Sequence, residues 1–405
     1  MKRWIALSVI VLWVGTAMGQ WQQTNYTEPM SVEDIFFVNE DVGYVVGYHE
    51  MYKTTDGGDS WSLVVANLFP NGPRHVFFIN ENVGFMAGSN SGLTTPIEIA
   101  KTINGGISWT VTELEGNPMT FSYGTDLFFV DENTGFLVCN GGSVYRTTDQ
   151  GDNWIRVYND ANEDFSEVHF PTPAVGYMIP TWGDEIYKTI NGGNSWAVFP
   201  TSVSMGNFGL HFVDEMTGFI VGNYSRIQRT TDGGMSWELT DLGTSDSFSD
   251  IQFTSATTGY AVGTNGTLVT TNDGGNTWTP RLSGVGDHLV CIDMVTDSVG
   301  YIGTSGFAKV LKTTNGGGIL SINETLEDAP ISIFPNPTNG IAQVSYPELK
   351  KPCGYRIVNT QGQVVQTGML LRPQSSIDLI ALPAGMYLLQ LDALSNYSAR
   401  FMRVD

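Results

Sequence analysis

Apolar and polar residues alternate in short segments that recur along most of the chain. In the first such segment, Ile35 and Phe37 are apolar and flank a less uniform position. The same pair recurs as Val76 and Phe78, Leu127 and Phe129, Val168 and Phe170, Leu210 and Phe212, Ile251 and Phe253, and Ile292 and Met294. Alternation with a period of two is typical of a β-strand that buries one face. We therefore expect these side chains to fill the space between neighbouring sheets.

An eight-residue sequence closes each repeat, first at residues 54–61 as TTDGGDSW. Asp or Asn at its third position can bind backbone amides ahead, and its glycines tolerate positive φ, so the sequence predicts a tight turn between strands. The Trp at its eighth position is expected to open the next strand and pack into the core. These pairs are Asp56 and Trp61, Asn104 and Trp109, Asp149 and Trp154, Asn191 and Trp196, Asp232 and Trp237, and Asp273 and Trp278. A seventh copy, at 313–320, lacks the Trp.

The missing tryptophan is expected at the other end of the chain. A glycine follows the first strand of every repeat, at Gly43, Gly84, Gly135, Gly176, Gly218, Gly259 and Gly300. Trp21 precedes Gly43 by 22 residues, the spacing that also separates Trp154 from Gly176. We therefore predict that the N-terminus donates the outer strand of the last sheet, which leaves no open edge. Four short strands per repeat over residues 20–320 predict an all-β, seven-bladed β-propeller closed by an N-terminal strand.

Composition and charge narrow the function classes. The 47 glycines, 12% aromatic residues and 15% charged residues suit an all-β protein with many turns. Residues 1–19 have two basic residues, an apolar run and small residues, as a secretory signal peptide does, and no later segment could span a membrane. A net charge of −22 disfavours nucleic-acid or anionic-lipid partners. We expect an exported, soluble monomer without metal or cofactor.

The three cysteines occupy non-equivalent positions, at Cys139, Cys291 and Cys353. An odd number in such places predicts small buried side chains rather than a disulfide framework.

The candidate ligand-binding residues lie in loops opposite the eight-residue turns. Repeat spacing is longer around 89–98 and 114–125, in loops that share this face, and loops on a rigid scaffold commonly carry function. Exposed Trp182, in a Thr-Trp-Gly-Asp loop, is the strongest candidate for stacking on a carbohydrate or peptide. The full set is Tyr48, His49, Trp182, Asp184, Tyr224 and Phe307.

Two further sets have both a functional and a structural interpretation. Near the propeller axis, His169, His211 and Asp293 could bind a cation, but no ligand spacing supports a metal site, and inner-strand acids more commonly bind neighbouring backbone. Cations precede six of the seven turns, at Lys53, Lys101, Arg146, Lys188, Arg229 and Lys312. They could dock an anionic partner, but we expect each to pair with a nearby carboxylate.

The eight-residue sequence resembles the Asp box, or BNR repeat, of sialidases and sortilin-like receptors, where it is a structural turn. Over residues 20–320 the regular form F-x-[ND]-x-x-x-G-[FY], followed by [KR]-T-x-[DN]-G-G-x-[ST]-W, resembles the photosystem II stability/assembly factor-like propellers. That resemblance implies a non-catalytic binding scaffold.

After the polar linker 321–330, residues 331–405 read as a small C-terminal β-sandwich. The ordered series PNPTNG, GQVV and PAGMYL resembles the type A C-terminal sorting domain of the type IX secretion system. This resemblance implies passage through the periplasm and delivery to the outer-membrane surface or the extracellular space.

Two functions remain open. The first is an exported propeller that binds a protein or glycan without catalysis, and the second is a sialidase-type glycoside hydrolase. The propeller arginines include no Arg-Ile-Pro motif near the first blade, and G-x-S-x-G and H-E-x-x-H are absent from the sequence. These observations favour the binding module.

Overall fold

The computed structural model divides the chain into two compact units, residues 1–320 and residues 321–405. The described residues are 21–27, 31–69, 72–88, 97–114, 123–306, 309–318, 332–334, 338–346, 349, 351–359, 364–391 and 398–403. The expected signal peptide, the linker 321–330 and Phe307 lie outside them.

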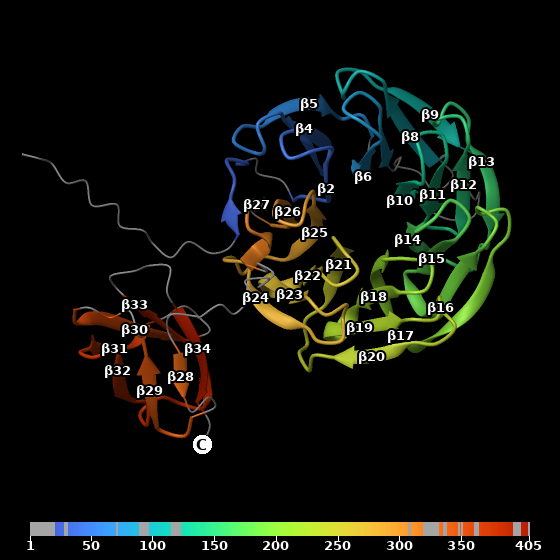
Figure 1. Ribbon diagram of the computed structural model, residues 1–405. Coiled ribbons are helices and arrows are strands. Elements are labelled where there is room, and N and C mark those ends of the chain that lie inside the picture. The colour runs from blue at the N-terminus through green and yellow to red at the C-terminus, as the bar shows by residue number, and fades with distance from the viewer. Residues whose placement is uncertain are drawn as a thin grey trace, which may run out of the picture. The chain divides into compact units, whose positions relative to one another are not determined.

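The first unit is a ring of antiparallel sheets around a central axis (Figure 1). The first three sheets follow the chain order. They comprise β2 (Asp34–Phe37), β3 (Gly43–Gly47), β4 (Glu50–Thr54) and β5 (Ser62–Ala66); β6 (Pro73–Phe78), β7 (Gly84–Gly88), β8 (Ile97–Thr102) and β9 (Thr110–Leu114); and β10 (Gly124–Phe129), β11 (Gly135–Cys139), β12 (Ser143–Thr147) and β13 (Ile155–Asn159). Glu98, Leu114 and Thr125, which were expected in long loops, thus belong to strands, and residues 89–96 and 115–122 of those loops lie outside the described residues.

A seven-stranded sheet follows, and it contains a strand shared by two repeats. Its members are β14 (Phe165–His169), β15 (Gly176–Pro180), β16 (Trp182–Thr189), β17 (Ala197–Phe212), β18 (Gly218–Gly222), β19 (Arg226–Thr230) and β20 (Glu238–Asp241), with the 3-10 turn η1 (Asn223–Ser225). The first part of β17 pairs with β16, and the part from Asn207 pairs with β18. We interpret this sheet as two four-stranded blades joined without a loop. On this interpretation the ring has the seven blades that the repeat predicts.

The last two sheets complete the ring. They are β21 (Phe248–Phe253), β22 (Gly259–Gly263), β23 (Thr267–Thr271) and β24 (Thr279–Leu282), then β25 (Leu289–Met294), β26 (Gly300–Thr304), β27 (Val310–Thr313) and β1 (Gln22–Gln23), with 3-10 turns η2 (Thr264–Gly266) and η3 (Gly316–Gly318). In β1, Gln22 pairs with Lys312 and Gln23 with Leu311. Trp21 is buried beside them. The N-terminal segment therefore supplies the outer strand of the last sheet.

Aromatic rings from neighbouring sheets stack on one another around the propeller. Phe37, at the end of β2, lies parallel to Tyr301 of β26 with ring centroids 3.5 Å apart. The corresponding pairs are Phe78 with Tyr44, Phe129 with Phe85, Phe170 with Phe136, Phe212 with Tyr177, and Phe253 with Phe219. At the remaining junction, Met294 packs in one cluster with Tyr260. In each case the last apolar residue of a first strand packs against the residue that follows the repeat glycine in the preceding sheet, as Phe37 does against Tyr301 after Gly300.

This stack explains the glycine of the repeat. A Cβ on Gly43 would lie 2.4 Å from the ring of Phe37, so no larger residue fits beneath that ring. The tryptophan of the turn contacts the same ring at its edge, with Phe37 and Trp61 centroids 6.1 Å apart at 90°. The turn tryptophans pack against the core clusters as expected, Trp278 as a buried member and the other five partly buried.

The eight-residue turn has the hydrogen bonds that its sequence predicts. Asp56 Oδ1 accepts from the Ser60 amide at 2.8 Å, and Thr54 Oγ1 accepts from the Gly58 amide at 2.9 Å. Gly57 and Gly58 both have positive φ, at 64° and 89°. Hydrogen bonds from Asn153 and Thr147 lower the pKa of the corresponding Asp149 to about 2.

The cations before the turns bind the next sheet instead of forming a docking ring. Lys53, Lys188 and Lys312 donate to the carbonyls of Gly105, Gly233 and Gly57, while Arg146 and Arg229 donate to Asn194 and Asn276. Among the described residues, Lys101 is the one of these six cations that contacts a carboxylate, that of Asp152. The expected carboxylate pairing is therefore wrong for five of the six. Each cation instead ties its sheet to the turn of the following one.

The second unit consists of two antiparallel sheets with one apolar core. One sheet holds β28 (Ser332–Phe334), β29 (Ile341–Ser345) and β32 (Gln374–Asp378), and the other holds β31 (Val364–Leu370), β30 (Cys353–Asn359), β33 (Gly385–Leu391) and β34 (Ser398–Arg403). Val344 and Ile377 of the first sheet belong to the same buried cluster as Ile357 and Leu389 of the second. This is the two-layer packing expected of a small β-sandwich.

Replacing Phe37 should show how much the aromatic stack stabilises the ring. Phe37→Ala removes the ring between Tyr301 and Trp61, and we expect it to lower the free energy of unfolding by about 3–5 kcal/mol. Tryptophan fluorescence in denaturant measures this in the propeller alone, because residues 331–405 contain no Trp. The exposed Ile107→Ala, at a side chain 79% exposed, is the control and should change it by no more than about 0.5 kcal/mol. Equal effects of the two changes would contradict the role of the stack.

Candidate functional site

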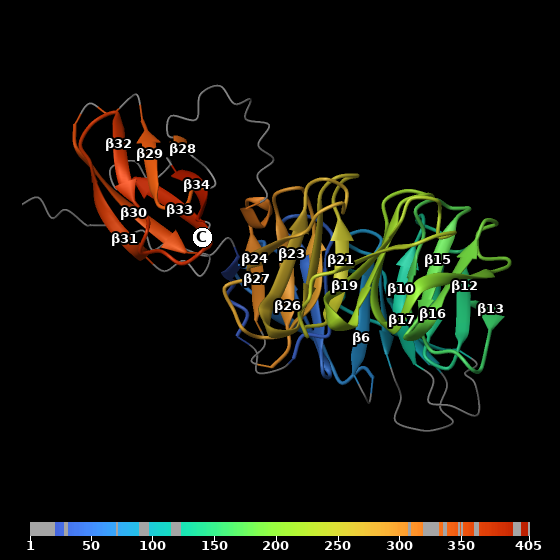
Figure 2. The ribbon, with the colours of Figure 1, turned by 90° about the horizontal axis from the view of Figure 1, so that it is seen from below.

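A cavity of about 610 Å³ runs along the propeller axis and is lined by the first strands of the sheets. Asp34 pairs with Val46, so β2 begins at the end where β3 finishes and the turn to β4 lies. The cavity wall extends to Phe208, Asn223, Ser247, Thr264 and His288, which lie at this same end. We call this end of the ring the loop face and the opposite end, with the eight-residue turns, the box face. Figure 2 shows the strands running between the two faces.

Carboxylates in the cavity bind the backbone of the next inner strand. Asp34 Oδ2 accepts from the Val76 amide at 2.9 Å, and Asp126 Oδ2 accepts from the Val168 amide at 2.8 Å. The same contact joins Glu167 to Leu210, Asp250 to Ile292, and Asp293 to Phe37. The structural interpretation of these acids is thereby favoured. They satisfy amides at strand edges that face the cavity.

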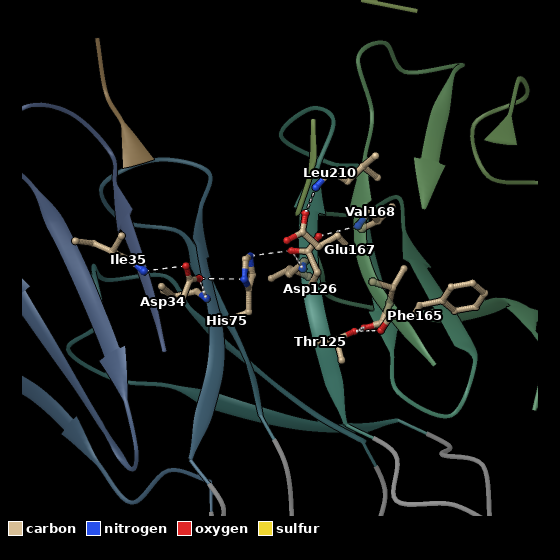
Figure 3. Close-up of polar contacts among 12 residues, drawn as sticks. Asp34, Ile35, His75, Thr125, Asp126, Phe165, Glu167, Val168 and Leu210 are labelled. Atoms are coloured by element: carbon tan, nitrogen blue, oxygen red, sulfur yellow. Dashed lines mark hydrogen bonds and ion pairs between the residues drawn. The ribbon is translucent and has the colours of Figure 1, made fainter. Parts of the chain in front are cut away.

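His75 takes the place of an acid in this series and bridges two of them (Figure 3). Its Nδ1 lies 3.0 Å from Asp34 Oδ2 and its Nε2 lies 3.0 Å from Asp126 Oδ1. Burial opposes the charged imidazolium, but the two carboxylates outweigh it and raise the pKa of His75 well above its ordinary value. A protonated His75 donates to both acids and links three consecutive inner strands.

Burial shifts the pKa of four other inner-strand groups in the direction that favours the neutral form. Burial, opposed by the Phe37 amide, raises the pKa of Asp293 to about 7, and burial likewise raises the pKa of Asp250 to about 6. Burial lowers the pKa of His211 to about 4, and burial beside His211 lowers the pKa of His169 well below its ordinary value. Among the described residues no group of three His, Cys, Asp or Glu side chains is arranged to hold a metal.

The loop-face candidates separate into different places. Trp182 begins β16 with 64% of its surface exposed, and its indole contacts the edge of Phe208, which lines the cavity. Tyr224 follows Asn223, another lining residue, in η1. Asp184 is exposed farther along β16. Tyr48 and His49 pack against each other between β3 and β4 and line no part of the cavity. Phe307 lies outside the described residues.

Sequence reasoning missed three residues beside the cavity. The sequence analysis gave His75 no role, although it stands at the position of the repeat that Asp34, Asp126, Glu167 and Asp250 occupy in other repeats. Phe208 and Asn223 were not considered, because neither belongs to the repeated pattern. Both converge with Trp182 on Gly206, whose absent side chain leaves room for them.

These features define the class: a secreted, Asp-box β-propeller with a sorting domain. Residues 15–162 and 235–335 match the family described as photosynthesis system II assembly factor YCF48, and residues 332–402 match the secretion system C-terminal sorting domain. The chain belongs to the YCF48 family of propellers. Its sorting domain implies secretion to the cell surface or extracellular space. No helix among the described residues is both long and apolar enough to cross a membrane.

Solved structures share the fold at low identity. YCF48 bound to D1 peptide aligns with a TM-score of 0.60 and 21% identity, covering 74% of this chain and 99% of that one. PorZ of Porphyromonas gingivalis, a surface component of the type IX secretion system, has a TM-score of 0.53 and 12% identity over 95% of this chain and 61% of PorZ.

A xyloglucanase of glycoside hydrolase family 74 from Xanthomonas campestris has a TM-score of 0.58 and 10% identity over 95% of this chain and 68% of the enzyme. No curated protein matches the sequence. Because these neighbours include a glycoside hydrolase, the fold does not decide between binding and catalysis.

The buried Asp293 should make stability depend on pH. Its pKa is about 7 in the folded protein and near the ordinary 3.8 when unfolded, so its ionisation disfavours folding as pH rises from about 4 to about 7. Asp293→Asn keeps an oxygen for the Phe37 amide but cannot ionise. Over this range the free energy of unfolding of the wild type should fall more than that of the variant, by on the order of a few kcal/mol. Parallel pH profiles from denaturant titrations would contradict this assignment.

Proposed function

We propose that this protein is an exported, non-catalytic binding module that holds a protein or glycan partner at the loop-face mouth of its central cavity. The observation that carries the proposal is the exposed indole of Trp182, which packs against Phe208, a residue that lines the 610 Å³ cavity. A concave space with aromatic side chains and a few polar groups is the usual form of a ligand site. The C-terminal domain directs the propeller through the type IX pathway to the outer-membrane surface, where it is anchored or released.

The contacts of the cavity acids support binding rather than hydrolysis. A glycoside hydrolase of the common two-carboxylate type needs one acid to protonate the leaving group and another to attack or to activate water. Here Asp34 and Asp126 bind His75 and a backbone amide each, and Glu167 binds the Leu210 amide. Carboxylates with these structural contacts are poorly placed to exchange protons with a substrate.

The sialidase alternative also lacks a converging arginine cluster. Arg74 is the one arginine among the cavity-lining residues, and its guanidinium lies over the ring of Tyr123. Arg146 and Arg229 bind the turns of neighbouring sheets, and Arg226 pairs with Asp241. A sialate carboxylate would therefore meet a single arginine beside several acids. The glycoside-hydrolase alternative retains support from the fold of the xyloglucanase alone.

Binding should depend on the loop face. We expect Trp182→Ala to weaken binding of the purified protein to immobilised cell-surface fractions of its host, measured by biolayer interferometry. Ile190→Ala is the matched control, because Ile190 is 72% exposed next to the opposite end of β16, on the box face. Protease and periodate treatment of the fractions distinguish protein from glycan partners.

A panel of fluorogenic glycosides tests the alternative with the same preparation. We expect no turnover, since the cavity acids have structural partners. Glycoside turnover that Glu167→Gln abolishes would overturn the proposal. Equal binding of the cell-surface fractions by Trp182→Ala and Ile190→Ala would also overturn it.

Export should require the C-terminal domain. A chain that ends at residue 330 keeps the propeller and its expected signal peptide but lacks the sorting domain. Cell fractionation should find this truncated chain in the periplasm and the full chain at the surface or in the medium. The full chain with Ile107→Ala is the control, because this exposed change in the propeller leaves the sorting domain intact, and it should reach the surface as the wild type does. Surface delivery of the truncated chain would contradict the assignment.

A further inference from the structure

Trp182 is not an isolated exposed ring, because Gly206, Phe208 and Asn223 lie beside it at the rim of the cavity. The backbone of Trp182 pairs with Gly206, and the indole meets Phe208 edge-on with centroids 6.3 Å apart. A Cβ on Gly206 would lie 3.1 Å from Trp182, 3.0 Å from Phe208 and 2.7 Å from Asn223 Nδ2. The glycine therefore lets an aromatic surface and an amide approach each other at the rim.

The wall that continues inward from this platform is rich in hydroxyl and amide groups. Ser247 Oγ donates to Asn223 Oδ1 at 3.1 Å, which fixes the amide orientation. Ser249 and Thr264 line the same wall, and Glu167 lies deeper in the cavity. Tyr224 stands beside Asn223 with φ of 64°, a conformation that non-glycine residues adopt rarely and that is frequent at ligand sites.

Capped amides disfavour the addition of a peptide strand to the inner sheets. Strand addition needs free backbone groups at a sheet edge. In this cavity the amides of Val76, Val168 and Leu210 already donate to carboxylates of the preceding strand, and those of Ile292 and Phe37 do the same. These contacts favour a ligand held by side chains, through ring stacking and hydroxyl or amide hydrogen bonds.

We propose that this rim binds a neutral oligosaccharide, with one sugar ring stacked on Trp182 and the next entering the cavity past Phe208 and Asn223. An indole offers a broad apolar face to the C–H face of a sugar. Asn223, Ser249 and Glu167 offer donors and acceptors for hydroxyl groups. Arg74 is the one Lys or Arg among the lining residues, so the cavity offers little to bind the carboxylate of a uronate or sialate, and a neutral sugar fits it better. This inference rests on the proposed binding function and names its ligand class.

Isothermal titration calorimetry on the full mature chain tests the inference. The probes are the neutral hexaoses of glucose, mannose, xylose and N-acetylglucosamine, with sialyllactose and hexagalacturonate as acidic probes. We expect at least one neutral probe to bind and neither acidic probe to do so. Trp182→Ala should raise the Kd of the neutral probe roughly tenfold, whereas Trp182→Phe should raise it less.

Two further variants test whether binding depends on the arrangement of residues around Trp182 and not merely on an exposed aromatic ring. Gly206→Ala should weaken binding because its Cβ displaces Trp182 or Asn223. Tyr48→Ala should change the Kd by less than about twofold, because Tyr48 is as exposed as Trp182, at 64%, but packs against His49 instead of the cavity-lining Phe208. Tryptophan fluorescence in denaturant establishes that each variant is folded.

Binding of acidic probes alone, or neutral binding that Trp182→Ala leaves unchanged, would overturn the inference. Failure of every neutral probe would overturn it too. In that case, loss of cell-surface binding by Trp182→Ala would still support the broader binding function, so the two failures are distinguishable.

Discussion

The stacking of each inner-strand ring on the aromatic residue of the preceding sheet is the constraint on which the rest of the structure depends. Phe37 on Tyr301 and Phe212 on Tyr177 lie almost parallel at 3.5 Å. This contact requires the glycine beneath the ring, positions the turn tryptophan at its edge and sets the spacing between sheets. The cations before the turns reinforce it at the box face. Since Lys312 reaches Gly57 and β1 pairs with β27, the same interactions join the last sheet to the first.

In this closed ring, the polar and titratable side chains that a ligand could reach lie along the axial cavity and at its loop-face end. At the axis, acids and His75 bind the backbone of neighbouring inner strands, so their charges serve the junctions between sheets. The loop face is freer to vary, because its turns lie outside the stacked layer. Where β17 runs unbroken from one repeat into the next, Gly206 and Phe208 bring the wall of the cavity beside Trp182. We therefore infer function from this rim and not from the eight-residue turn, although the turn is the most regular feature of the sequence.

The sequence predicts the repeated elements well because their causes are local. The turn needs Asp56, Thr54 and two glycines in one short segment, and the period places Trp21 beside the last sheet. Contacts between repeats are harder to predict. The partners of Lys53 and His75 lie in other sheets, and their distances depend on how the sheets are rotated around the axis. Phe208 and Asn223 were missed for a related reason, since one-off residues carry no periodic signal. Trp182 was found because an aromatic residue among polar residues and glycine is visible in sequence alone, although it and Asp184 belong to β16 and not to the expected loop.

The central claim is that carboxylates cap one amide on each of five inner strands, so that ligands meet side chains at the rim. Hydrogen–deuterium exchange at residue resolution tests it directly, through the amides of Phe37, Val76, Val168, Leu210 and Ile292. These amides should exchange as slowly as those within β3 and β18, because each donates to a carboxylate inside the ring. Exchange as fast as in the exposed turns would contradict the claim and would leave the inner edges open to a peptide strand.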